Sequence, residues 1–125
     1  MTYAFIFPGQ GSQYVGMGEN LITDFPNTRH VFEQLDDELN QKLTDVIFGG
    51  PEDQLTLTEN AQPALFAVSI AIVRVLRDEF GLDLSEVVKF AAGHSLGEYS
   101  ALAAFDAIQF SDGVKILKAR GKAMQ

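Results

Sequence analysis

Cysteine is absent from these 125 residues, so they can form no disulfide bond and offer no thiolate to a metal ion. A long uninterrupted apolar run is also missing. The longest, from Pro63 to Val73, is too short to span a bilayer and is followed by Arg74. The N-terminus carries no positively charged leader. We therefore expect a cytoplasmic protein that has no membrane partner.

Positive charge is scarce. Nine lysines and arginines against 17 aspartates and glutamates give a net charge of −8 at pH 7, which argues against a nucleic-acid partner. The charge is unevenly distributed, because residues 19–59 are strongly acidic whereas residues 113–125 contain no acid. The apolar fraction of 46%, with ten phenylalanines, is that of a globular domain with a real core.

The most informative stretch is residues 91–99, Ala-Ala-Gly-His-Ser-Leu-Gly-Glu-Tyr. Apolar residues from Val87 to Ala92 predict a short buried strand, and Glu98 to Phe105 predicts a helix. Between these elements the chain must reverse sharply. Gly93 and Gly97 suit that turn, since they lack the Cβ atoms that would collide.

Ser95 stands at the top of this turn, where a substrate carbonyl can reach its hydroxyl group. The backbone N–H of Leu96 is expected to stay free at the helix N-terminus, where it can stabilise a developing oxyanion. A Gly-x-Ser-x-Gly sequence also fits a glycine-rich turn with a capping serine. The strand before it and the helix after it favour a nucleophile.

A first buried strand is predicted from Tyr3 to Phe7, and the glycine-rich loop 8–13 follows it. The spacing argues against a dinucleotide site, because Tyr14 stands where the third glycine of that fingerprint is needed. Glycines on both sides of Gln10 suit another use of such a loop. They can bring a backbone N–H close to a reacting group.

Helices are predicted over residues 27–40 and, as a short turn, over residues 43–48. A central, buried helix is expected to begin near Pro63 and to end near Phe80, because proline is tolerated in a first turn. Gln62 precedes it and can either cap this helix or face the site. We expect it to cap.

A last helix is predicted over residues 111–125, capped by Ser111 or Asp112. At 100° per residue its three lysines fall on one side, while Arg120 falls on the other, apolar side. That side consists of Ile116, Leu117, Ala123 and Met124. A guanidinium is costly to bury alone, so Arg120 should either pair with a buried carboxylate or bind an anionic ligand.

Four motifs carry a family resemblance: Phe-Pro-Gly-Gln-Gly-Ser-Gln at 7–13, Gln-Pro-Ala-Leu-Phe at 62–66, Gly-His-Ser-Leu-Gly-Glu-Tyr at 93–99 and Arg-Gly-Lys-Ala-Met-Gln at 120–125. In this order they resemble the malonyl-CoA:acyl carrier protein transacylases and the acyltransferase domains of fatty-acid and polyketide synthases. The motifs reach from one end of the chain to the other, which makes the resemblance far more specific than any one of them.

The resemblance implies an α/β fold, an α/β-hydrolase-like large subdomain with a parallel sheet that is incomplete in this chain. Residues 1–125 would be the N-terminal part of that subdomain. The ferredoxin-like small subdomain and the rest of the sheet would be absent. No permanently bound cofactor and no metal is implied, since the coenzyme A thioester is the substrate and acyl carrier protein is the partner.

The resemblance also implies a role in fatty-acid biosynthesis and assigns a function to four residues. Ser95 matches the nucleophile that takes the malonyl group from malonyl-CoA as an ester. Gln10 and Leu96 match the pair whose backbone N–H groups form the oxyanion hole. Arg120 matches the arginine that holds the free malonyl carboxylate in a two-pronged pairing, a geometry that lysine cannot supply.

The family's general base is a histidine far beyond the serine and outside this chain, and we expect neither His30 nor His94 to replace it. Two strands and several apolar helices should leave apolar faces uncovered. The isolated chain is therefore expected to be catalytically feeble and to self-associate or bind the missing C-terminal half. Two alternatives remain at this stage: a serine esterase of α/β-hydrolase type, and a non-catalytic fragment or interaction module.

Overall fold

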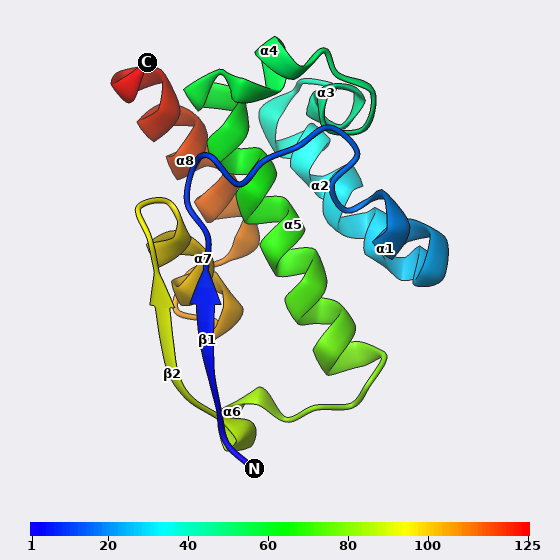
Figure 1. The fold of residues 1–125 in the computed structure, drawn as a ribbon, viewed down its shortest axis with the longest axis vertical. Coiled ribbons are helices and arrows are strands. Elements are labelled where there is room, and N and C mark those ends of the chain that lie inside the picture. Colours follow the sequence, from blue (N-terminus) through cyan, green and yellow to red (C-terminus); the bar gives the residue numbers. More distant parts are fainter.

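The computed structural model describes all 125 residues as a helix-rich α/β fold with two strands, which confirms the predicted fold class. The elements are β1 (Tyr3–Phe7), α1 (Glu19–Asp24), the 3-10 turn η1 (Pro26–Thr28), α2 (Arg29–Leu39), α3 (Leu43–Gly49), α4 (Glu52–Thr56), α5 (Thr58–Asp78), α6 (Leu84–Val87), β2 (Val88–Gly93), α7 (Gly97–Ala104) and α8 (Phe110–Met124). The strands lie side by side and parallel, and α5 runs beside them (Figure 1).

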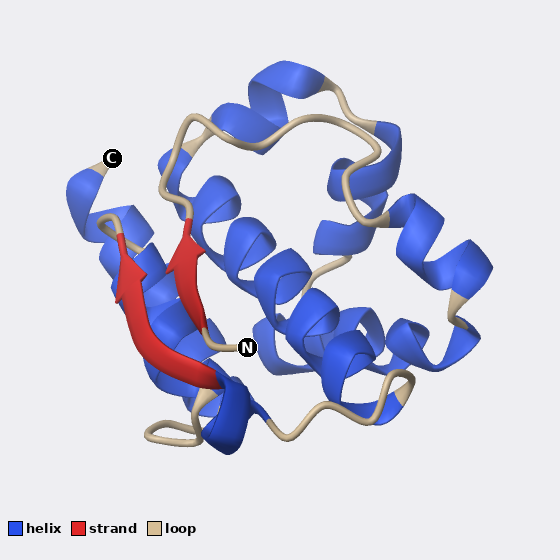
Figure 2. Cartoon of the chain, turned by 60° about the horizontal axis from the view of Figure 1, so that its bottom comes forward, coloured by secondary structure: helices blue, strands red, loops and turns tan.

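The prediction that both strands are buried is wrong for one face of the sheet. Phe7 on β1 is buried and packs into the core. Ile6 and Phe90, in contrast, are 80% and 76% exposed. The helices pack against one side of the two strands and leave the other side open (Figure 2). On β1 only Phe7 is buried, and on β2 no residue is buried and residues 89–92 are all exposed, so the helices cover β2 even less than β1.

The central helix begins earlier than predicted. α5 starts at Thr58, so Pro63 lies inside the helix rather than at its first position. The N–H groups of Asn60 and Ala61 donate to the carbonyl of Leu57 and form the first turn. Proline at 63 removes a single hydrogen bond, that to the carbonyl of Glu59, close to the start of the helix.

α5 is also long enough, at 21 residues, and apolar enough, with a mean hydropathy of 1.2 over 18 residues, to cross a membrane. However, 72% of that window is buried inside the fold. The helix packs against α2, α4, α7 and α8. Its apolar character is therefore explained by its place at the centre of the core.

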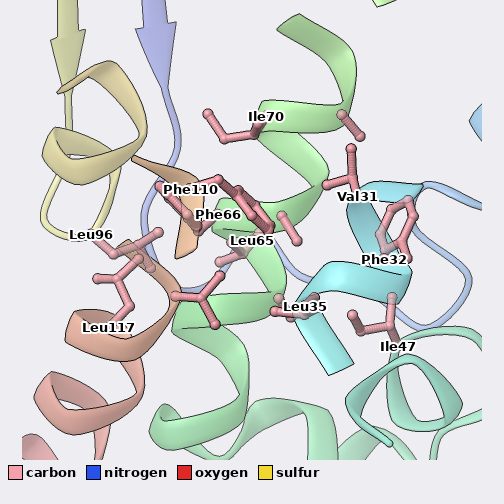
Figure 3. Packing of buried hydrophobic residues seen from close by; sticks show 14 of the residues in the cluster. Val31, Phe32, Leu35, Ile47, Leu65, Phe66, Ile70, Leu96, Phe110 and Leu117 are labelled. Carbon is pink, nitrogen blue, oxygen red and sulfur yellow. The ribbon is translucent and has the colours of Figure 1, made fainter. Parts of the chain in front are cut away.

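The hydrophobic core is made mainly of side chains from α2, α5 and α8, together with Leu96 (Figure 3). Phe66 on α5 is fully buried and stacks on Phe110 at the start of α8, with 5.3 Å between the ring centroids. Leu96 and Leu117 are fully buried as well. Because Leu96 directly follows Ser95, the core fixes the backbone of the predicted nucleophile.

The last helix differs from the prediction at both its start and its buried face. α8 begins at Phe110, and the N-cap residue is Gln109, whose side chain makes no capping bond. The buried residues are Phe110, Gly113, Val114, Leu117 and Gly121. Ile116 and Met124 are instead 42% and 56% exposed. Two of these five buried residues are glycines, which a search for apolar side chains does not identify.

Close packing brings the C-terminal half of α8 to the start of α5 (Figure 1). A Cβ atom on Gly121 would lie 2.6 Å from the Cα of Glu59 and 2.7 Å from the carbonyl oxygen of Thr58. Two side-chain contacts reinforce this approach. Lys118 Nζ lies 3.4 Å from the Glu59 carboxylate, and Gln125 Nε2 donates to it at 3.1 Å. The Gln125 hydrogen bond, with the charge of Lys118, lowers the pKa of Glu59.

Gly121→Ala is expected to destabilise the fold by about 1–3 kcal/mol, because the added methyl group meets backbone that cannot rotate away. The measurement is urea unfolding of the full-length gene product that carries these residues. Gly49→Ala is the matched control, since its Cβ would meet nothing within 4 Å at the end of α3. Equal free energies of unfolding for the two variants would show that α5 and α8 can move apart to accommodate the methyl group without loss of stability.

Candidate active site

The turn between β2 and α7 has the sharp geometry that the sequence predicts. Ser95 adopts a φ of 57°, in the left-handed region that residues other than glycine rarely occupy. A Cβ on Gly93 would overlap the backbone of Gly97, and a Cβ on Gly97 would overlap the carbonyl of Phe7. Both glycines are thus required sterically, and the strained backbone directs the Ser95 side chain out of the turn.

Residues 8–13 lie directly beside this turn. The His94 N–H donates to the carbonyl of Phe7 at 3.1 Å, which extends the β1–β2 pairing into the loop. A Cβ on Gly9 would lie 2.7 Å from Nδ1 and from the carbonyl oxygen of His94. The Gln10 side chain donates to Thr58 Oγ1 at 3.2 Å, so it points toward the start of α5.

Several backbone N–H groups at this place, that of Ser95 among them, have no acceptor in the chain. Neither the N–H of Gln10 nor that of Leu96 donates a hydrogen bond to any protein group. The next two N–H groups after Leu96, those of Gly97 and Glu98, are occupied by His94 and Ser95 carbonyls. Free N–H groups beside a serine hydroxyl are what stabilisation of an oxyanion requires.

Arg120 reaches this turn from α8. Its Nη2 donates to Ser95 Oγ at 3.2 Å, and its Nη1 donates to Gln62 Oε1 at 2.7 Å. The guanidinium carbon lies 5.7 Å from the centroid of the Tyr99 ring, within cation–π range. Helical periodicity placed Arg120 only on the apolar side of a helix, and its assignment to the site came from the family resemblance. The structure brings it to the predicted nucleophile.

No carboxylate lies within 4.0 Å of the Arg120 guanidinium, although the side chain is half-buried. Its hydrogen-bond partners are a hydroxyl and an amide, both neutral. This favours the second of the two interpretations of Arg120, an arginine that awaits an anionic ligand. A planar guanidinium can pair with a carboxylate through two parallel hydrogen bonds.

The prediction that Gln62 caps the central helix is wrong. Because α5 begins four residues before it, Gln62 lies within the helix, is only 1% exposed and faces Arg120. Its Nε2 also donates to Met124 Sδ at 3.5 Å. The sequence left two roles open for Gln62, and the structure supports the one that we did not prefer, a side chain that faces the site.

Neither histidine makes a hydrogen bond to Ser95. His30 is on the surface of α2, with a side chain 75% exposed and 4.0 Å from Glu33. His94 is exposed, and its ring lies over Gly9. Ser95 Oγ accepts its one side-chain hydrogen bond from Arg120. No group of three or more histidines and acids is placed to hold a metal ion.

These parts together suit acyl transfer. A strained serine presents its hydroxyl group, N–H groups without an acceptor lie in the same turn and in the loop beside it, and a guanidinium without an acidic partner lies 3.2 Å from the hydroxyl oxygen. Such a site can accept an acyl group that carries a negative charge at its far end.

Comparisons with known proteins agree with this chemistry. The profile of the acyl transferase domain matches residues 4–125. The malonyl CoA-acyl carrier protein transacylase of Bacillus subtilis strain 168 is 47% identical over 121 residues, which is 97% of this chain. The crystal structure of an acyl-carrier-protein S-malonyltransferase from Bartonella henselae is 56% identical and superposes with a TM-score of 0.96 over the whole chain.

A further solved structure contains a malonyl-transacylase in complex with a type II polyketide-synthase acyl carrier protein. It is 42% identical, with a TM-score of 0.92. The chain spans 37% of the length of the Bacillus relative and 40% of the Bartonella protein. The similarity therefore covers this chain fully and those proteins in part.

Proposed function

This chain belongs to the acyl transferase domain family, and we propose that it carries the nucleophile and the carboxylate-binding arginine of a malonyl-CoA:acyl carrier protein malonyltransferase. The observation that carries the proposal is the contact between Arg120 and Ser95. An arginine without an acidic partner, 3.2 Å from a serine hydroxyl, is suited to an acyl group that ends in a carboxylate. A neutral acyl group would leave that guanidinium unpaired.

In the proposed reaction, Ser95 Oγ attacks the thioester carbonyl carbon of malonyl-CoA. The carbon–sulfur bond breaks, and coenzyme A leaves as its thiol after it gains the proton that Ser95 loses. The acyl-enzyme then passes malonyl to the thiol of acyl carrier protein by the reverse exchange. The proton needs an acceptor, and the resemblance assigns that role to a histidine that lies beyond residues 1–125.

Two groups would stabilise the tetrahedral intermediate. The N–H groups of Gln10 and Leu96 have no acceptor in the chain and would donate to the oxyanion. Arg120 would hold the malonyl carboxylate, while Gln62 and the Tyr99 ring keep its guanidinium in place. On this proposal, Gln62 is a positioning residue.

We place residues 1–125 in the N-terminal part of the large acyltransferase subdomain. The fractions of 37% and 40% support a chain that corresponds to part of such a protein, and its assignment to the N-terminal part rests on the family resemblance. Acyl carrier protein as the acceptor is supported by the relative that was solved in complex with one. The cytoplasm is the proposed compartment, and fatty-acid biosynthesis the proposed role.

Intact-mass measurement tests the proposal on the full-length gene product that carries these residues. With malonyl-CoA we expect a mass increase of one malonyl group, and with acetyl-CoA a much smaller fraction of acetylated protein. Addition of acyl carrier protein should remove the malonyl group and transfer it to the carrier. Equal labelling by both thioesters, lost to water and not to the carrier, would instead identify a general serine esterase.

A further inference from the structure

A polar cavity of about 440 Å³ lies away from Ser95, between α2, α5 and the connection from α7 to α8. None of the residues that contact Ser95 or Arg120 lines it. Phe110, which forms part of its wall, precedes Arg120 by ten residues on α8, about 15 Å along a helix. The polar side chains in its lining are Gln34, Arg74, Arg77, Asp106, Gln109 and Ser111.

Arg74 and Arg77 stand one turn apart on α5, so their side chains lie on the same face of the helix. Both are half-buried. The Arg74 guanidinium carbon lies 5.3 Å from the centroid of the Phe110 ring, and Arg77 Nη2 donates to the carbonyl of Ala104 at 2.9 Å. The aromatic ring and the carbonyl hold the two guanidinium groups against the cavity wall.

This pair of like charges has no counter-charge in contact. Neither arginine has a carboxylate within 4.0 Å, and Arg74 makes no side-chain hydrogen bond. Burial lowers the pKa of Arg74, Asp78 acts in the opposite direction, and the neighbouring Arg77 lowers it further. Two half-buried cations side by side destabilise each other unless an anion lies between them.

We propose that this cavity binds the phosphate group of a small phosphorylated ligand. Arg74, Arg77 and Asp106 give the lining a net positive charge, and a phosphate group has enough oxygens to accept hydrogen bonds from both guanidinium groups at once. Guanidinium groups donate in the planar, paired geometry that phosphate oxygens accept. The amides of Gln34 and Gln109 and the Ser111 hydroxyl add neutral donors to the same lining. A volume of about 440 Å³ leaves room for the organic part of the ligand.

Asp106 lines the same cavity and lowers its affinity for an anion, because a carboxylate repels negative charge. Its backbone φ is 62°, a conformation that asparagine adopts as readily as aspartate. Asp106→Asn therefore removes one negative charge without added backbone strain. The proposal requires that this variant bind phosphate more tightly than the natural protein does.

Calorimetric titration with inorganic phosphate at low ionic strength tests the site in the full-length gene product. We expect saturable binding of one phosphate, weakened at least tenfold in Arg74→Gln and in Arg77→Gln. Arg29→Gln is the control for net charge, because Arg29 is exposed on α2 and does not line the cavity. Asp106→Asn should bind about three- to tenfold more tightly, since a like charge is removed.

The absence of saturable phosphate binding by the natural protein would overturn the proposal. So would an equal loss in Arg29→Gln, or an unchanged or weaker affinity in Asp106→Asn. Circular dichroism of each variant shows whether it is folded. Should either cavity arginine prove necessary for folding, Asp106→Asn decides the question, because its expected effect is a gain. These results do not depend on malonyl transfer, which is measured at Ser95.

Discussion

Replacing Ser95 with alanine is expected to abolish the covalent acyl adduct that the full-length gene product forms with malonyl-CoA. The alanine side chain has no oxygen, so no ester can form, while the free N–H groups of Gln10 and Leu96 remain. Loss of the nucleophile of a serine enzyme lowers kcat by about 10⁴- to 10⁶-fold, and only binding and the oxyanion hole contribute afterwards. Intact-mass spectrometry and a transfer assay measure the two effects on one sample.

Ser100→Ala is the matched control for this variant. Ser100 lies on α7, five residues after Ser95, and is fully buried with a hydroxyl group that has no hydrogen-bond partner. Its removal breaks no bond, so both adduct and turnover should be retained. An undiminished malonyl adduct on Ser95→Ala would exclude Ser95 as the nucleophile.

The Ser95 turn could be predicted from the sequence because most of its constraints are local. Gly93 is needed to avoid overlap with the backbone of Gly97 and Glu98, a few residues away, so the spacing in the sequence already indicates it. Gly97 is needed for a different reason, the close approach of Phe7 on β1, and the sequence alone does not show that contact. The free N–H of Leu96 follows from its place before a helix. The position of Gln10 depends on contacts between distant parts of the chain, such as its hydrogen bond to Thr58, 48 residues away. Its role in an oxyanion hole was therefore expected only from the flanking glycines and the family resemblance.

Gln62 and the strands show where local reasoning fails. A proline indicated a helix start at Pro63, but tertiary packing of α5 against α8 stabilises an earlier turn, and Gln62 is then carried into the interior. Phe90 and Ile6 belong to apolar strands and yet are exposed. Apolar side chains indicate a surface that is stabilised by burial. They do not show which element of the fold packs against that surface.

Removal of the Arg120 side chain is the second large effect that we expect, and it should depend on the acyl group. Arg120→Ala leaves the malonyl carboxylate without its partner, while acetyl transfer loses no ion pair. Truncation of one member of a buried charge pair costs about 2–5 kcal/mol, so malonyl transfer should fall roughly 30-fold or more. Acetyl transfer should be unchanged or higher. The measurement is kcat/KM for malonyl-CoA and acetyl-CoA.

Two further variants separate charge from geometry at this position. Arg120→Lys keeps the charge but cannot form two parallel hydrogen bonds, so it should recover little of the malonyl preference. Gln62→Leu removes the amide that accepts from Nη1 at 2.7 Å and should reduce the preference to a lesser degree, because Arg120 itself remains. Lys122→Ala, an exposed position on the same helix, controls for lost charge. Equal losses for malonyl and acetyl transfer in Arg120→Ala would mean that this arginine supports the fold, and its selective role would have to be abandoned.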